Sequence, residues 1–382
     1  MRPHAFEIAL LGRANGIVSV NDVLRVEVRE PTTYVPAAIG KACPHVVYPN
    51  LNDHGYLKVK LDDRSVNNLK YSLNEVQDPM LRHQLWYAVW DKVRDAEFSY
   101  VSFSDLLVPE AIAKETNDLM LRQLTFTAGS VVNYYRHTPS LKDKQASTFT
   151  DRLDREIWQR LKTAKGGSND QLVWFESVAN TFSSPWGLEQ IKDLLNGKQT
   201  LAGLKIDQDR RWILVNTLAR FNDKDALALI DREAKKDTSS EGLEQKMSSL
   251  AARPVWEEKM KWVEEYKLPK STYSFSQQRA AFSTLFPANQ FEMRERFSEQ
   301  FFKDLTVVNK TKENFIAGLF TRLAPFECSI NSAGKIKAYL EKNSDLQPGL
   351  IKNLKIMAQE GERCRNVVAY AEKANQVPAP AQ

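Results

Sequence analysis

Cysteine is scarce in this chain of 382 residues, which contains only Cys43, Cys328 and Cys364. Their number is odd and no C-x-x-C pair occurs, so the sequence indicates neither a disulfide framework nor a zinc site built from thiolates. Such sparse use of cysteine fits a reducing compartment. We therefore predict a cytoplasmic location and no disulfide framework.

Long hydrophobic runs and a strong charge imbalance are also lacking. No stretch approaches the roughly 18 apolar residues that cross a bilayer, and the first residues carry no pattern of a secretory signal, so no membrane partner is expected. The 53 Lys and Arg residues exceed the 48 Asp and Glu residues by a net charge of only +5. Because no dense basic block alternates with aromatic residues, nucleic acid is not an expected partner either.

The motifs of common catalytic sites are missing as well. No histidine begins the H-E-x-x-H pattern, which places two zinc ligands and a base on one helix face. The chain also has no G-x-S-x-G nucleophile elbow, no P-loop and no G-x-G-x-x-G turn. We therefore predict no catalytic residue, no metal ligand and no cofactor in this chain. The five histidines are His4, His45, His54, His83 and His137.

The first 63 residues have the pattern of strands. Apolar Leu24, Val26 and Val28 alternate with charged residues, and an earlier run alternates Phe6, Ile8 and Leu10 with smaller or polar neighbours. Gly12 to Gly16 between them is suited to a hairpin turn. We interpret residues 1–47 as the remnant of a β-sandwich and residues 48–63 as a connecting strand, with pairing expected over residues 56–61.

From residue 64 to residue 372 the pattern is helical. Apolar residues recur three and four positions apart, and the helix of residues 78–93 is apolar on two faces, as a helix between two neighbours would be. Polar joints separate the helices, and N-caps or turn residues are expected at Asn169-Asp170, Ser183-Ser184-Pro185, Asp207, Asp223 and Ser239. These features predict a mainly α fold, an α-solenoid or superhelix of HEAT-like helix pairs, ending in a flexible tail at 373–382.

The strand region poses a question, because a small sheet with one apolar face needs a cover. Two answers remain open from the residues alone. Either a further part of the sandwich is missing upstream, or the helical domain covers the apolar face.

Three segments carry a family resemblance. Residues 50–64 contain Gly55-Tyr56-Leu-Lys-Val59 followed by acidic residues, residues 76–97 contain a D-P-x-x-R element with L-W and W-D pairs, and residues 203–212 read Gly203-Leu-Lys-Ile-Asp-Gln-Asp-Arg-Arg-Trp212. In this order they resemble the C-terminal region of the bacterial type of aminopeptidase N zinc metallopeptidases. The resemblance extends from residue 2 to about residue 372.

The resemblance implies a chain without its own active site. In this family the zinc ligands and the exopeptidase motif lie in domains that precede the region seen here, so zinc belongs to a catalytic domain outside this chain. The helical domain of such enzymes closes over the active site, forms a peptide chamber and modulates substrate access. The resemblance therefore implies a catalytic domain and peptides as partners.

Four residues are candidates for peptide contact, namely Arg82, Arg210, Arg211 and Trp212. A guanidinium facing a concave surface could hold a peptide carboxylate with two hydrogen bonds. The alternative, which we favour, is that Arg82 and Arg211 pair with acidic residues such as Asp91 or Asp207 and join neighbouring helices. The tryptophans, Trp212 included, are more often core residues than ligand platforms.

Two functions from different classes remain. The chain is a non-catalytic domain of a zinc aminopeptidase, or it is a free-standing α-solenoid that grips a partner protein on its concave face.

Overall fold

The computed structural model describes residues 3–268, 270–312, 314–325, 328 and 331–376. These residues form a three-stranded sheet and sixteen α-helices, which makes the protein mainly helical, as predicted. The strands are β1 (His4–Ala14), β2 (Ile17–Val28) and β3 (Val46–Pro49). The helices are α1 (Asp63–Leu69), α2 (Pro79–Arg94), α3 (Tyr100–Leu106), α4 (Asp118–His137), α5 (Lys144–Thr163), α6 (Asn169–Thr181), α7 (Pro185–Leu195), α8 (Gln208–Arg220), α9 (Ala226–Lys236), α10 (Ser240–Ala252), α11 (Trp256–Lys267), α12 (Phe275–Thr284), α13 (Phe291–Thr311), α14 (Asn314–Phe320), α15 (Ser332–Lys342) and α16 (Pro348–Gln376).

The chain divides into two compact units. The first takes in residues 1–128 and 373–382, and the second takes in residues 129–372. The segments predicted as a sandwich remnant and a connecting strand thus share the first unit with α1, α2 and α3. Their assignment to a sandwich domain stays a prediction.

The sheet of the first unit is antiparallel, with the order β2-β1-β3. The predicted hairpin joins β1 to β2 through Asn15 and Gly16, which both have positive φ (52° and 73°) and so fit a tight two-residue turn. The expected alternation along β1 is interrupted, because the register with β2 shifts between Leu10 and Leu11. As a consequence Ala9, Leu10 and Leu11 are all buried.

Residues 56–61 are not a strand, and the prediction of pairing there is wrong. The segment is instead held along the C-terminal end of α2. Lys58 forms an ion pair with Asp95 (2.6 Å), and Nζ of Lys92 donates a hydrogen bond to the carbonyl oxygen of Leu61 (3.1 Å). An extended chain that packs on a helix buries alternate residues just as an edge strand does, so the two arrangements share one sequence pattern.

One face of the sheet is covered within the first unit. Val18 of β2 forms a bridge with Val76, which precedes α2, and both are buried, as are Leu24 and Val26. Strand β3 contacts α1, where Ser65 Oγ accepts a hydrogen bond from the backbone of Val47. The sequence left two possibilities open for the apolar face of the sheet. For this face the second one applies, because residues of the helical region cover it.

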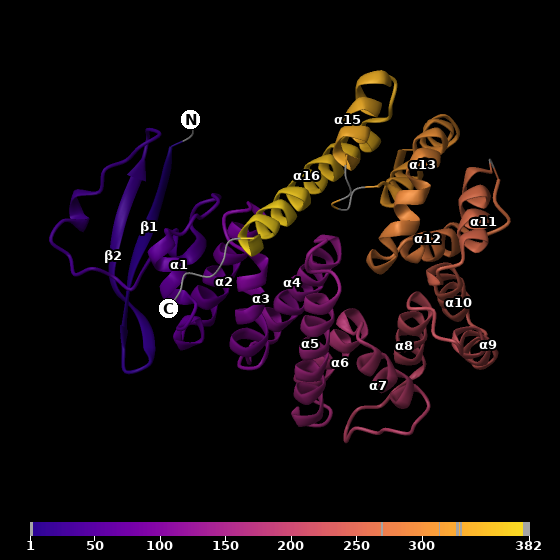
Figure 1. Cartoon of the computed structure of the whole chain (residues 1–382), viewed down its shortest axis with the longest axis horizontal. Helices are drawn as coiled ribbons and strands as arrows, with labels where there is room; N and C mark the ends of the chain where they lie inside the picture. Colours follow the sequence, from indigo (N-terminus) through magenta and orange to yellow (C-terminus); the bar gives the residue numbers. More distant parts are fainter. Residues whose placement is uncertain (1–2, 269, 313, 326–327, 329–330, 377–382) are drawn as a thin grey trace. The chain divides into compact units, whose positions relative to one another are not determined.

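The second unit is an α-solenoid. Contacts join α6 to α8, α8 to α10, α10 to α12 and α12 to α14, so the even-numbered helices stack in one layer. Odd-numbered helices make the same contacts from α5 to α7 and from α11 to α13. Figure 1 traces these helices one after another in chain order. Each pair therefore hides its apolar surface against the next, as the succession of helices with polar joints predicts.

The helix boundaries follow from capping side chains. Asp62, Asp78, Ser184, Asp207 and Ser239 each cap a helix by accepting backbone N–H groups of the first turn. The prediction is therefore confirmed for capping at Ser184, Asp207 and Ser239. At Asn169-Asp170 the cap is instead the preceding residue, Ser168, and Asp223 lies in the turn before α9, where its carboxylate accepts a hydrogen bond from the backbone of Asp225.

At the C-terminus α16 continues through Gln376, so the first residues of the predicted tail are helical. Residues 377–382 lie outside the described residues. Among the described residues, no helix has both the length and the apolar content that crossing a bilayer requires.

The cysteines correct one prediction. Cys328 and Cys364 are joined by a disulfide in the second unit, with their Cα atoms 4.9 Å apart, whereas Cys43 forms no disulfide and is exposed. The two paired residues are 36 positions apart. Such pairing depends on which helices the fold brings together, and spacing alone carries no signal for it.

Candidate functional site

The histidines are dispersed in the fold. His45, for example, lies beside Ser72, with 2.8 Å between its Nε2 and Ser72 Oγ, and burial followed by the positive charge of Arg13 lowers its pKa. No group of three or more His, Cys, Asp or Glu side chains in the described parts of the chain is arranged to hold a metal ion. These side chains therefore do not fit a zinc site.

Arg82 belongs to the first unit and is held by a carboxylate. Its Nε and Nη2 donate to both oxygens of Glu115 at 2.8 and 2.9 Å, and its Nη1 donates to the carbonyl oxygen of Val76. Burial opposes ionisation of Glu115, but the hydrogen bonds from Arg82 and from the backbone lower the pKa of its carboxyl. This bidentate pair ties the start of α2 to the segment before α4.

The other three candidate residues meet at the start of α8 in the second unit. Arg210 donates to the carbonyl oxygen of Lys205 (2.9 Å) and pairs with the cap residue Asp207. Trp212 is buried, and its indole N–H donates to Asp237 at 2.8 Å. These two side chains therefore fasten α8 to its own entry loop and to the turn before α10.

Arg211 is the candidate residue that reaches a pocket. Its Nε and Nη2 donate to the two oxygens of Glu233 at 2.7 and 2.6 Å, and its Nη1 donates to the carbonyl oxygen of Leu195 at 3.0 Å. Arg82 and Arg211 thus both form ion pairs that join neighbouring segments, which is the alternative that we favoured. Their partners are Glu115 and Glu233, and not Asp91 or Asp207 as suggested. Contact with a peptide stays a prediction for all four residues.

Glu233 lies at the centre of a group of cations. Its carboxylate has no exposure to solvent and accepts hydrogen bonds from Arg211 and Arg232, while Nζ of Lys236 lies 3.5 Å from its Oε1. Burial opposes the ionised form, but hydrogen bonds from the two guanidinium groups lower the pKa of the carboxyl to about 2. Glu233 is therefore ionised at neutral pH and offsets one of three positive charges.

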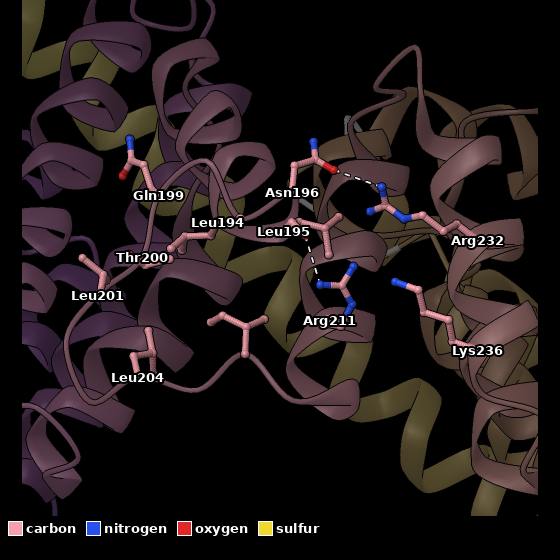
Figure 2. A pocket seen from close by; sticks show the side chains of 12 residues that line it. Leu194, Leu195, Asn196, Gln199, Thr200, Leu201, Leu204, Arg211, Arg232 and Lys236 are labelled. Atoms are coloured by element: carbon pink, nitrogen blue, oxygen red, sulfur yellow. Dashed lines mark hydrogen bonds between the residues drawn. The ribbon is translucent and has the colours of Figure 1, made fainter.

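These cations line one side of a pocket of about 460 Å³ in the second unit. Figure 2 shows the charged ends of Arg211, Arg232 and Lys236 gathered on that side, with Leu194, Leu201 and Leu204 on the other. The remaining lining residues are Leu195, Asn196, Gly197, Gln199, Thr200 and Ile206. The pocket thus combines a cationic wall with an aliphatic one.

The segment 203–212 singled out in the sequence builds much of this pocket. Gly203 has φ +76°, and a Cβ there would lie 2.4 Å from backbone atoms of Gly166 and Gly167. Only glycine tolerates both conditions, so the loop can pack closely on the joint between α5 and α6. Leu204 and Arg211 then line the pocket while Asp207 starts α8.

The second motif also has a structural role. In residues 76–97, Asp78 caps α2, Pro79 occupies its first position, and Trp86 and Trp90 are buried. Trp86 and Trp90 both contact the ring of Phe103 on α3. The expectation that the tryptophans are core residues is confirmed for this pair and for Trp212.

The sequence does not predict the two other cations of the pocket wall, Arg232 and Lys236, or the carboxylate behind them, Glu233. All lie in the run Asp231-Arg-Glu-Ala-Lys-Lys236, which has the composition of a solvated helix face. The C-terminal end of a helix carries a partial negative charge, which repels a glutamate in the last turn. The position of Glu233 is therefore the one sequence signal that this carboxylate has a positively charged partner elsewhere.

Comparison with known proteins agrees with the fold. The family model described as "ERAP1-like C-terminal domain" matches residues 46–359. The chain is also 27% identical over 361 residues to a protein named Aminopeptidase N from Streptomyces lividans. That match covers 91% of this chain but 40% of the relative, so the chain spans well under half of the relative's length. Because the family model spans most of the chain, this protein belongs to the ERAP1-like C-terminal domain family.

Proposed function

We propose that this chain acts as the non-catalytic helical domain of a zinc aminopeptidase. One observation carries the proposal: the match to Aminopeptidase N covers 91% of this chain and 40% of the relative. A protein with that name needs a catalytic centre, and the chain has no H-E-x-x-H motif to supply one. Zinc and the catalytic residues then belong to a part of the enzyme that this chain does not match.

In this role the domain closes over the catalytic part and forms a chamber for peptides. A solenoid suits the task because stacked helix pairs create an extended concave surface. Among the four candidate residues, Arg211 lines the pocket described above, which is why we assign it contact with a peptide. Access of substrate would then depend on how the solenoid lies over the active site.

We further propose that an apolar face of α4 contacts the catalytic part. Leu119 and Phe126 lie seven positions apart, hence on one side of the helix, and are 79% and 74% exposed. A partner that lies along this side of α4 would bury both side chains and remove their apolar surface from water. In an aminopeptidase that includes this domain, the catalytic part would be the protein that binds this side of α4.

Association with the rest of the enzyme tests the proposal. The part of the Streptomyces lividans relative that this chain does not match would be produced separately, mixed with the chain and analysed by size-exclusion chromatography with light scattering. We expect a one-to-one complex that Phe126→Ser weakens by about tenfold, because a buried aromatic contact is lost. The matched control is Leu227→Ser, which removes an exposed apolar residue of α9 and leaves the complex unchanged.

Absence of any complex would contradict the proposal. It would favour the alternative, a free-standing α-solenoid that binds some other protein on its concave face.

We also propose a cytoplasmic location. Because cytoplasmic thiols are held reduced, the disulfide between Cys328 and Cys364 would be open there, and both residues would react with an alkylating reagent added to intact cells before lysis. Protection of both thiols from the reagent would count against this location.

A further inference from the structure

The pocket beside Arg211 has more positive charge than the one carboxylate paired with it, that of Glu233, can neutralise. Arg211, Arg232 and Lys236 are its charged lining residues, and the other nine are uncharged. Both oxygens of Glu233 are engaged by this group, which leaves a net charge of about +2 at the wall. Several acidic side chains of the neighbouring segments have partners of their own: Asp193 pairs with Lys198, Asp207 pairs with Arg210, and Asp237, next to Lys236, accepts hydrogen bonds from Trp212 and Ser239.

Donors in this wall remain open to a ligand. Arg232 donates from Nε to Glu233 and from Nη1 to Asn196 Oδ1, but its buried Nη2 has no hydrogen-bond partner among the described residues. Lys236 is half exposed, and at 3.5 Å its ammonium group lies beyond the usual hydrogen-bond distance from Glu233. Nη2 is shielded from solvent in this conformation, but the Arg232 side chain is 38% exposed, so a shift of the guanidinium toward the pocket would let a bound anion satisfy this donor.

The opposite wall sets the rest of the ligand's chemistry. Leu194, Leu201 and Leu204 present aliphatic groups to the pocket, so a strongly hydrated inorganic ion would gain nothing from them. A volume of about 460 Å³ lies within the usual range of small-molecule sites. The lining therefore suits a compact anionic group on a short apolar body.

We propose that this pocket binds a small organic anion, a carboxylate or phosphate monoester attached to a short aliphatic chain. The anionic group accepts hydrogen bonds from Arg232 and Lys236, and the aliphatic chain packs on Leu201 and Leu204. The inference rests on the pocket alone and does not depend on the proposed function.

Calorimetric titration of the full chain tests the inference. The probes are hexanoate, hexyl phosphate, hexanol and inorganic phosphate. We expect hexanoate or hexyl phosphate to bind one per chain, and to bind at least tenfold more tightly than either hexanol or inorganic phosphate. The ratio between the two anions identifies which head group the site prefers.

Two variants assign the binding to this pocket. Lys236→Gln is expected to weaken binding of the preferred anion by about tenfold, because a charge-assisted hydrogen bond is lost. The matched control, Lys235→Gln, removes the same charge from the neighbouring position, which does not line the pocket, and leaves affinity unchanged. Leu201→Ala is expected to weaken binding by about fourfold through lost apolar contact, with thermal unfolding as the check that each variant folds.

Three results would overturn the inference. They are equal binding of hexanol and hexanoate, equal effects of Lys236→Gln and Lys235→Gln, and no binding of either anion at millimolar concentration.

Discussion

The ammonium group of Lys259 lies inside the second unit, where its side chain has no exposure to solvent. Nζ donates hydrogen bonds to the carbonyl oxygens of Ala251 and Leu285, at the ends of α10 and α12, and lies 5.3 Å from the centre of the Phe286 ring. One side chain thus satisfies carbonyl groups of two helix ends that have no partner within their own helices. Burial, followed by the charge of Arg294, lowers the pKa of Lys259 to about 7.

This pKa predicts how stability depends on pH. Between about pH 7 and 10.5 the unfolded chain holds a proton on this lysine that the folded chain releases, so the contribution of Lys259 to stability rises with pH in that window. Lys259→Met removes both hydrogen bonds and should lower the free energy of unfolding by about 2 kcal/mol. The loss should be greater at pH 9 than at pH 6.5.

Urea unfolding of both proteins at the two pH values measures this difference. A loss of the same size at pH 6.5 and pH 9 would show that Lys259 does not titrate in this range.

The residues of the pocket illustrate what a sequence can and cannot reveal about a site. Arg211 was identified because it stands in a motif, and a role in joining helices was favoured for it. Glu233 lies 22 positions further along the chain, and its contact with Arg211 depends on how α9 packs against α8. Such a contact leaves no trace in local composition, and for the same reason the pocket was not foreseen.

At the scale of elements, the loop between α7 and α8 depends on two glycines with different surroundings. Both have positive φ, +71° at Gly197 and +76° at Gly203. An added Cβ at Gly197 would meet nothing within 4 Å, whereas at Gly203 it would lie 2.4 Å from the backbone of Gly166 and Gly167. Substitution by alanine separates the cost of backbone strain from the cost of lost close packing.

We expect Gly197→Ala to lower the free energy of unfolding by about 1 kcal/mol, through strain alone. Gly203→Ala should cost at least twice as much, because the loop must also move away from the joint between α5 and α6. Urea unfolding of the two variants provides the measurement. Equal losses would mean that the close approach at Gly203 does not stabilise the loop.

The sequence predicts the start of a helix well where the side chain that determines it lies within the same few residues. Asp207 and Ser239 were recognised as caps because a capping side chain bonds to its own helix. Residues 56–61 were misjudged because alternating burial is common to a strand and to an extended segment that lies on a helix. The Cys328–Cys364 disulfide was missed for a further reason, since it joins two separate segments of the chain.

At the scale of the whole molecule, the fold follows from one repeated requirement. The helices from α5 to α14 have apolar residues that the next pair covers, so these helices stack in chain order. This solenoid was predictable from period and joints, without exact repeats in the sequence. The division into units, with a boundary inside α4, was not, because no change of composition marks residue 128.

The proposed function is that this chain contributes to peptide hydrolysis without performing it. The most direct test is release of a dye from an amino-acid amide, measured with zinc for the chain alone, for the unmatched part of the Streptomyces lividans relative alone, and for both together. We predict no zinc-dependent turnover by the chain alone and at least tenfold faster turnover by the mixture than by the unmatched part. Zinc-dependent turnover by the chain alone, or no gain on mixing, would contradict the claim.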